Sequence, residues 1–301
     1  MGDNIMKNVI IKTRSAVRTH VGMVRQNNED NFLLSGIYYN QGAVNEKNQS
    51  TSGWNSFSFH ALMDGLGGQN AGEVASGMAA ALFSVCFGQL HKKQPTEGKI
   101  KKIQETIYQA NKAIYEKAAS DVAFSKMGTT FTGLLLDNAS ATVMHLGDSR
   151  AYLLRSGQLT QLMVDHTEAE RMVRLGLLKR EDVRGHRSRF LLNRNLGVPP
   201  EYGVMQAERS QTFPILAGDL FLLCSDGLTD MVSDESITHI LTAKQSLEQK
   251  CDQLIQTALS HGGEDNVTVL LTQVERISRG LINPRILVEE LHRWIKKGKL
   301  K

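Results

Sequence analysis

Four aspartates stand where an apolar run of the sequence meets a turn. They are Asp64 after FSFHALM, Asp148 after ATVMHLG, Asp226 after DLFLLCS, and Asp265 just before NVTVLLTQV. Runs of this length and composition predict strands, and a rigid sheet can hold carboxylates from several strand ends together. Converging carboxylates repel one another unless a cation neutralises them, and such oxygen ligands suit Mg²⁺ or Mn²⁺. A metal site is therefore the leading interpretation.

The alternative for any single Asp-Gly pair is the turn of a hairpin, which needs a strand on both sides. Here the segments after Asp64 and Asp226, GLGGQNAGEVASGMAAAL and GLTDMVSDESITHI, both have helical patterns. The hairpin interpretation is accordingly weaker than the metal site at these two positions.

A polar cluster, Arg25-Gln26-Asn27-Asn28-Glu29-Asp30-Asn31, precedes the apolar residues FLL. A surface turn is the ordinary interpretation of such a segment. However, Arg25 carries a planar fork of donors that can bind a phosphate through two hydrogen bonds. Acids for a metal and an arginine for phosphate together indicate phosphoryl chemistry.

Other catalytic motifs are incomplete in this sequence. Gly65-Leu66-Gly67-Gly68 lacks the third glycine of a dinucleotide-binding loop, and GDSRA is one residue short of the nucleophile elbow of serine hydrolases. No P-loop motif, HExxH pair or Cys/His cluster occurs, and the three cysteines have no CxxC spacing. These patterns argue against a dehydrogenase, a serine hydrolase, a P-loop nucleotide hydrolase and a zinc site of soft ligands.

The elements that must position the acids alternate irregularly along the chain. Strands are expected at 57–63, 128–136, 141–146, 151–154, 219–224 and 266–272, and helices at 73–90, 100–114 and 247–259. The polar residues 40–55 are expected to form a surface loop. Because strands and helices do not alternate one by one, antiparallel strands covered by a few long helices are favoured over a doubly wound parallel sheet.

The chain has 301 residues and a net charge of +4, but this charge is unevenly distributed. Residues 276–301 hold eight Lys and Arg against two Glu, so residues 1–275 carry a net −2 and give no sign of nucleic-acid binding. The segment after Asn283-Pro284 has the pattern of a basic amphipathic helix. Three roles stay open for it: docking on the body of the protein, binding a protein partner, or binding an anionic membrane surface.

The sequence also lacks an apolar run of the ~20 residues that cross a bilayer, and its start is unlike a secretory signal peptide. We expect a cytoplasmic monomer.

Six segments, taken in order, resemble the metal-dependent protein phosphatases of the 2C type, and bacterial members especially. They are VRQNNEDNF (24–32), MDGLGGQNAGEVAS (63–76), MGTTFTGLLL (127–136), HLGDSRAYLLRSGQLTQL (145–162), LCSDGLTDMVSDE (223–235) and GGEDNVTVLL (262–271). The resemblance implies an α+β fold, a four-layer α-β-β-α sandwich with two central antiparallel sheets. It also implies a phosphatase domain over residues 10–275, followed by the extension at 276–301.

The same resemblance implies roles for individual residues. Asp64 corresponds to the carboxylate that bridges two Mg²⁺ or Mn²⁺ ions, the Gly65 carbonyl to a ligand of one ion, and Asp226 and Asp265 to ligands of the other. Glu29 corresponds to an acid near the second ion, with Asp30 beside it. Asp148 would hold a third, weaker ion together with Asp226, and Arg25 would bind the phosphate.

Two positions depart from the family pattern. Leu66 stands where many eukaryotic members have a histidine, so the acid that protonates the leaving oxygen is unassigned, and a metal-bound water is our candidate. In the flap, residues 168–196, Arg187 follows His186 where bacterial relatives often have Pro. The arginines of the flap either recognise acidic or phosphorylated substrates or form a solvated basic face.

The function that the resemblance implies is hydrolysis of phosphoserine and phosphothreonine in proteins, by attack of metal-activated water and without a covalent intermediate. Its partners would be phosphorylated proteins and an opposing Ser/Thr kinase system. Two alternatives remain: a pseudophosphatase that binds phosphoproteins without turnover, and a phosphatase of a small phosphorylated metabolite.

Overall fold

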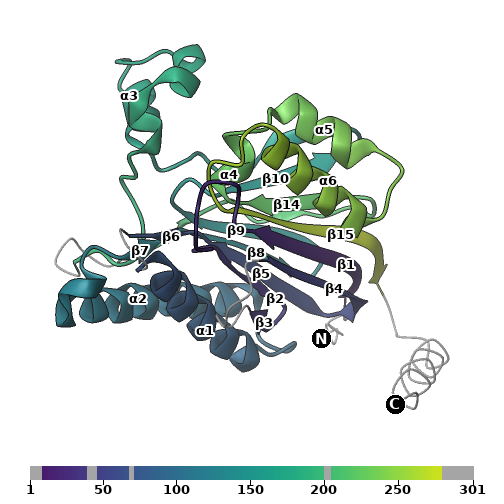
Figure 1. The fold of residues 1–301 in the computed structure, drawn as a ribbon. Helices are drawn as coiled ribbons and strands as arrows, with labels where there is room; N and C mark the ends of the chain where they lie inside the picture. The colour runs from purple at the N-terminus through teal and green to yellow at the C-terminus, as the bar shows by residue number, and fades with distance from the viewer. Residues whose placement is uncertain (1–8, 39–45, 68–70, 200–204, 280–301) are drawn as a thin grey trace, which may run out of the picture.

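Two antiparallel sheets lie face to face, and helices cover the outer face of each sheet (Figure 1). The structure, a computed structural model, describes residues 9–38, 46–67, 71–199 and 205–279. The predicted α+β sandwich of four layers is confirmed. None of the helices that the structure describes combines the length and the apolar composition needed to span a bilayer.

The first sheet has six strands in the order β11-β10-β14-β15-β1-β4. Their bounds are β1 Val9–His20, β4 Glu46–Asn55, β10 Arg150–Arg155, β11 Gln158–Gln161, β14 Leu220–Cys224 and β15 Val267–Arg279. β1 and β15 pair along their whole length, from Val9 opposite Arg279 to His20 opposite Val267. The first and last described strands are thus neighbours near the middle of the sheet.

The second sheet has seven strands, in the order β12-β9-β8-β5-β2-β3 with β13 also paired to β9. Their bounds are β2 Asn31–Leu34, β3 Ile37–Tyr38, β5 Phe57–Met63, β8 Phe131–Asp137, β9 Ser140–Leu146, β12 Glu208–Arg209 and β13 Phe213–Pro214. A separate pair, β6 (Gly65–Leu66) with β7 (Gly128–Thr129), extends the end of β5 toward the start of β8.

Helices α1 (Gly72–Gln89) and α2 (Thr96–Ser120) cover the seven-stranded sheet, and α4 (Asp226–Thr229), α5 (Asp234–Thr242) and α6 (Leu247–Ser260) cover the six-stranded sheet (Figure 1). The short 3₁₀ helix η1 (Val122–Phe124) follows α2. The flap holds α3 (Glu168–Arg174), η2 (Arg180–Gly185) and η3 (Arg187–Phe190), and it projects from the sandwich.

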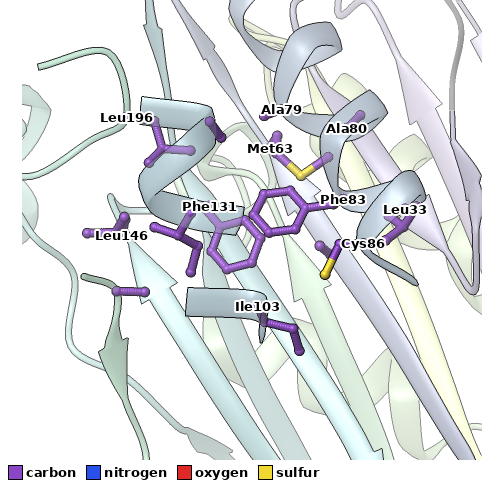
Figure 2. Close-up of a cluster of buried hydrophobic side chains, with 14 of the residues drawn as sticks. Leu33, Met63, Ala79, Ala80, Phe83, Cys86, Ile103, Phe131, Leu146 and Leu196 are labelled. Atoms are coloured by element: carbon purple, nitrogen blue, oxygen red, sulfur yellow. The ribbon is translucent and has the colours of Figure 1, made fainter. Parts of the chain in front are cut away.

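Apolar side chains form three buried layers, one between the sheets and one under each group of helices. Ile100, Ile103 and Ile107 recur at helical spacing and are all on the buried face of α2. In the layer under α1 and α2, Phe83 of α1 stacks on Phe131 of β8 with ring centroids 4.4 Å apart (Figure 2). This packing fixes the helical layer on the sheet that carries Asp64 at its edge.

Three sequence predictions need correction. The surface loop expected at 40–55 is wrong for residues 46–55, which form β4 and pair with β1 at the sheet edge. The strand expected at 128–136 is interrupted after Thr129, which pairs with Gly65 in the small sheet. Residues 276–279 continue β15, so the boundary expected at residue 275 falls inside a strand. The helix expected after Asn283 lies outside the described residues.

Candidate active site

Asp64 lies just after β5, where its backbone is held by two threonines. The Thr130 hydroxyl accepts from the Asp64 amide at 2.9 Å, while the Thr129 hydroxyl and the Thr130 amide both donate to the Asp64 carbonyl at 2.8 Å. Both threonines therefore position the acid through its main chain.

The other strand-end acids converge on Asp64. Burial raises the pKa of Asp64 well above its usual range, and the nearby charges of Asp30, Asp226, Asp148 and Asp265 raise it further. Burial raises the pKa of Asp226 in the same way, with Asp148, Asp230, Asp265 and Asp30 adding to the effect. Strand ends from both sheets thus bring these carboxyl groups within electrostatic reach of one another.

Asp148 lies in the turn between β9 and β10, after Gly147, which has a positive φ of 113°. Burial raises the pKa of Asp148 to about 7, and the charges of Asp165 and Asp230 contribute. Asp165 is itself held by Arg150, whose Nε and Nη2 donate to Asp165 Oδ2 at 2.9 and 2.7 Å. Arg150 therefore pairs with Asp165, the acid whose charge contributes most to the raised pKa of Asp148 after burial.

Glu29 lies against the start of α1 in a space that only glycine leaves open. A Cβ atom on Gly72 would come within 2.4 Å of Glu29 Oε2, and a Cβ atom on Gly65 would come within 2.3 Å of the Gly72 carbonyl oxygen. The Gly65 amide also donates to the Glu29 carbonyl at 3.2 Å. Burial raises the pKa of Glu29 to about 7, and the charge of Glu73 adds to this.

Asp30 is fully buried beside Glu29 and is only partly satisfied. The hydroxyls of Thr268 and Ser225 donate to its Oδ2 at 2.6 and 2.8 Å. Its Oδ1 receives no hydrogen bond from a donor of the described residues, and the Asp64 side chain lies close to the Asp30 carboxyl group. Burial raises the pKa of Asp30 to about 6, although the two hydroxyls oppose the shift.

Asp265 and Arg25 form an ion pair at the edge of this cluster. Arg25 Nη2 donates to Asp265 Oδ2 at 2.6 Å, while about half of the Arg25 side chain remains exposed. The arginine predicted to bind phosphate therefore lies beside the predicted metal ligands and pairs with one of them.

Asn266, which the sequence analysis did not single out, holds the loop that carries Arg25 and Glu29. Its Oδ1 accepts from the Glu29 amide at 2.7 Å, and its Nδ2 donates to the carbonyls of Val21 and Asn27 at 2.8 and 2.9 Å. A lone asparagine after an aspartate is typical of a turn, so this role had no distinct signal in the sequence.

Asp230 was also missed, and Arg189, one of the flap arginines considered for substrate recognition or for a solvated basic face, was not predicted to pair with it. Asp230 lies four residues after Asp226, a spacing that places both on one side of a helix and could have marked it. Arg189 of η3 donates to Asp230 at 2.5 Å and so connects the flap to α4. A cavity of about 310 Å³ lies between the flap and the body, and Asp148, Asp226 and Asp230 line one side of it.

The residues present fit a cation. Burial, together with the charges of neighbouring acids, raises the pKa values of Asp64 and Asp226, and Asp30 Oδ1 has no donor within the described part of the chain. As placed, no three His, Cys, Asp or Glu side chains of the described residues are gathered tightly enough to hold one ion. Carboxylates that approach one another repel, and a divalent cation between them would offset this repulsion.

Comparison with known proteins gives a consistent result. Residues 19–267 match the family model described as "Protein phosphatase 2C". A serine/threonine phosphatase, stp, of Listeria monocytogenes is 35% identical over 265 residues, which are 87% of this chain and 96% of that protein. The serine/threonine protein phosphatase PstP of Mycobacterium tuberculosis is 34% identical over 282 residues, 93% of this chain and 48% of that protein.

Solved structures agree with the sequence comparison. The crystal structure of Mycobacterium tuberculosis PstP/Ppp is 33% identical with a TM-score of 0.72, and the match covers 88% of this chain and 100% of that one. A structure of the catalytic domain of PstP in complex with two manganese ions is 32% identical with a TM-score of 0.70, covering 89% and 100%. This chain belongs to the protein phosphatase 2C family of serine/threonine phosphatases, as its sequence motifs predict.

Proposed function

We propose that this chain hydrolyses phosphoserine and phosphothreonine in proteins with the help of two Mg²⁺ or Mn²⁺ ions. The observation that carries the proposal is the convergence of buried strand-end carboxyl groups: burial and the neighbouring acids raise the pKa values of Asp64 and Asp226. Asp64, the Gly65 carbonyl, Asp226, Asp265 and Glu29 would hold the two ions, with Asp30 behind them. Asp148 and Asp226 would hold a third, weaker ion.

Bound ions of this kind supply a water acidified toward neutrality for in-line attack on phosphorus. The chain's own residues supply position and charge. Thr129 and Thr130 fix the backbone of Asp64, and Asn266 fixes the loop that carries Glu29. The exposed part of the Arg25 guanidinium can donate to the non-bridging phosphate oxygens, where negative charge increases in the transition state. The leaving oxygen has no proton donor in Leu66, so its acid stays unassigned.

A turnover assay on a phosphothreonine peptide, with and without Mn²⁺, tests this proposal, and Asp64→Asn is the decisive variant. We expect activity only with added metal, and a loss of several orders of magnitude in Asp64→Asn. Calorimetric titration of Mn²⁺ in the same variant separates lost metal binding from lost chemistry. Full activity in EDTA would refute the metal assignment.

Two other functions would give different results in the same assay. A pseudophosphatase would bind the peptide without turnover, and the presence of every predicted acid argues against it. A metabolite phosphatase would prefer small phosphomonoesters over phosphopeptides at equal concentration.

We also propose that the chain works in the cytoplasm as a monomer and opposes a Ser/Thr kinase. The extension predicted at residues 276–301, of which residues 276–279 belong to β15, keeps its three open roles. Deletion of residues 281–301 separates docking on the body, which predicts lower thermal stability, from salt-sensitive binding to a partner or an anionic lipid.

A further inference from the structure

The loop between β1 and β2 exposes two large apolar side chains next to Arg25. Met23 is 67% exposed and Val24 is 66% exposed. A single exposed apolar residue is ordinary on a protein surface, but adjacent ones beside a reaction centre form a patch that can bind a ligand.

The loop is fixed in the conformation that exposes them. The Met23 amide donates to the Gly263 carbonyl at 2.7 Å, and the Gly22 amide donates to His20 Nδ1 at 2.9 Å. Gly22 has a φ of 87°, and a Cβ atom there would come within 2.3 Å of the Asp265 carbonyl oxygen. Together with the two bonds from Asn266, these contacts prevent the loop from folding over to bury Met23 and Val24.

The same contacts place this part of the loop at the rim of the carboxyl cluster. Met23 Cγ lies over Gly263, two residues before Asp265, and Val24 directly precedes the arginine that pairs with Asp265. In Figure 1 the loop is the purple segment at the end of the sandwich, close to β6 and to α4. A phosphorylated side chain that reaches Arg25 would bring its neighbours in the peptide over Met23 and Val24.

We infer that Met23 and Val24 form an apolar subsite for a residue that flanks the phosphoserine or phosphothreonine of the substrate. This inference rests on the proposed function and specifies its substrates as phosphopeptides with an apolar flanking residue. Covering about half of one aliphatic side chain corresponds to about a tenfold preference in kcat/KM. Arg25 would then bind the phosphate, and the apolar patch would contact the residue beside it in the peptide.

The test compares two phosphothreonine peptides that differ only in the residues flanking phosphothreonine. One peptide has Leu on both sides, and the other has Ser on both sides. The full chain with Mn²⁺ should prefer the Leu peptide about tenfold in kcat/KM. The double variant Met23→Ser/Val24→Ser should reduce this ratio below about twofold, and Met23→Leu/Val24→Ile should keep it. The matched control is Leu216→Ser, which changes a residue that is 52% exposed in the loop before β14, at the opposite end of that strand from Asp226.

The outcomes separate this inference from the proposed function. A wild-type chain that turns over p-nitrophenyl phosphate and both peptides without preference would overturn the subsite alone. A preference that survives the double serine variant would also overturn it, as would an equal loss in Leu216→Ser. No turnover of any of the three substrates would refute the proposed function, and the subsite with it.

Discussion

Asn266 offers the sharpest test of how the site is assembled, because one side chain holds three main-chain groups of a distant loop. In Asn266→Ala the Glu29 amide and the carbonyls of Val21 and Asn27 lose the hydrogen bonds described above. Asn266 is 5% exposed, so water reaches these groups poorly. Leaving each group unpaired costs about 1 kcal/mol or more, and the three together give a loss of about 3 kcal/mol in the free energy of unfolding.

Urea unfolding in EDTA measures this loss without any contribution from bound metal. The matched control is Asn48→Ala on β4, an exposed asparagine for which we expect a change within about 0.5 kcal/mol. With Mn²⁺ present, the alanine variant should also show weaker metal binding, since Glu29 is no longer held. A loss below about 1 kcal/mol at Asn266 would refute the claim that these hydrogen bonds fix the loop.

Three further predictions concern charge. Arg25→Ala should lower kcat/KM on a phosphopeptide about 10- to 100-fold while Mn²⁺ still binds, and Arg25→Lys should recover only part of this loss. Full recovery in the lysine variant would show that Arg25 acts through its positive charge alone and not through two hydrogen bonds. Burial lowers the pKa of His60 to about 4, below its value near 6.5 in the unfolded chain, so the free energy of unfolding should be highest above pH 6.5 and fall toward pH 4. His60→Leu should reduce the slope of unfolding free energy against pH in this range by about one proton. An unchanged slope would contradict the expected effect of burying a neutral His60. Lys99 Nζ lies 3.0 Å from Asp137 Oδ2, and both side chains are buried. Lys99→Met should therefore lower the free energy of unfolding in urea by about 3–5 kcal/mol, and the double variant with Asp137→Leu should regain much of this loss. Equal losses in the single and the double variant would refute the explanation that an unpaired buried charge causes the loss.

The sequence predicts the acids of the site better than it predicts the strands and side chains around them. Asp64 and Asp226 end apolar runs that only a strand explains, and a carboxylate at a strand end has a recognisable local pattern. The strand at 46–55 was missed because its serines, threonines and glutamine are those of an exposed edge strand, which lacks the apolar alternation used to detect strands.

Contacts between distant segments could not be predicted from the sequence, for a different reason. Arg189 and Asp230 are 41 residues apart, and Asn266 is 237 residues from Glu29. No local pattern indicates which arginine meets which acid, or that one asparagine holds a loop near the other end of the chain. Such pairings follow from how the sheets are ordered, which periodicity alone does not determine.

The central position of β15 affects the stage of folding at which the candidate site is assembled. β15 lies between β14 and β1, so during synthesis the six-stranded sheet keeps an open gap until the last described strand leaves the ribosome. Closing that gap is a long-range event, which makes it slow compared with local helix formation. Because Asp265 and Asn266 directly precede β15, the loop carrying Arg25 and Glu29 lacks its contacts with these two residues before this step. A chain without β15 therefore lacks the contacts that hold Arg25 and Glu29 beside Asp265 and Asn266.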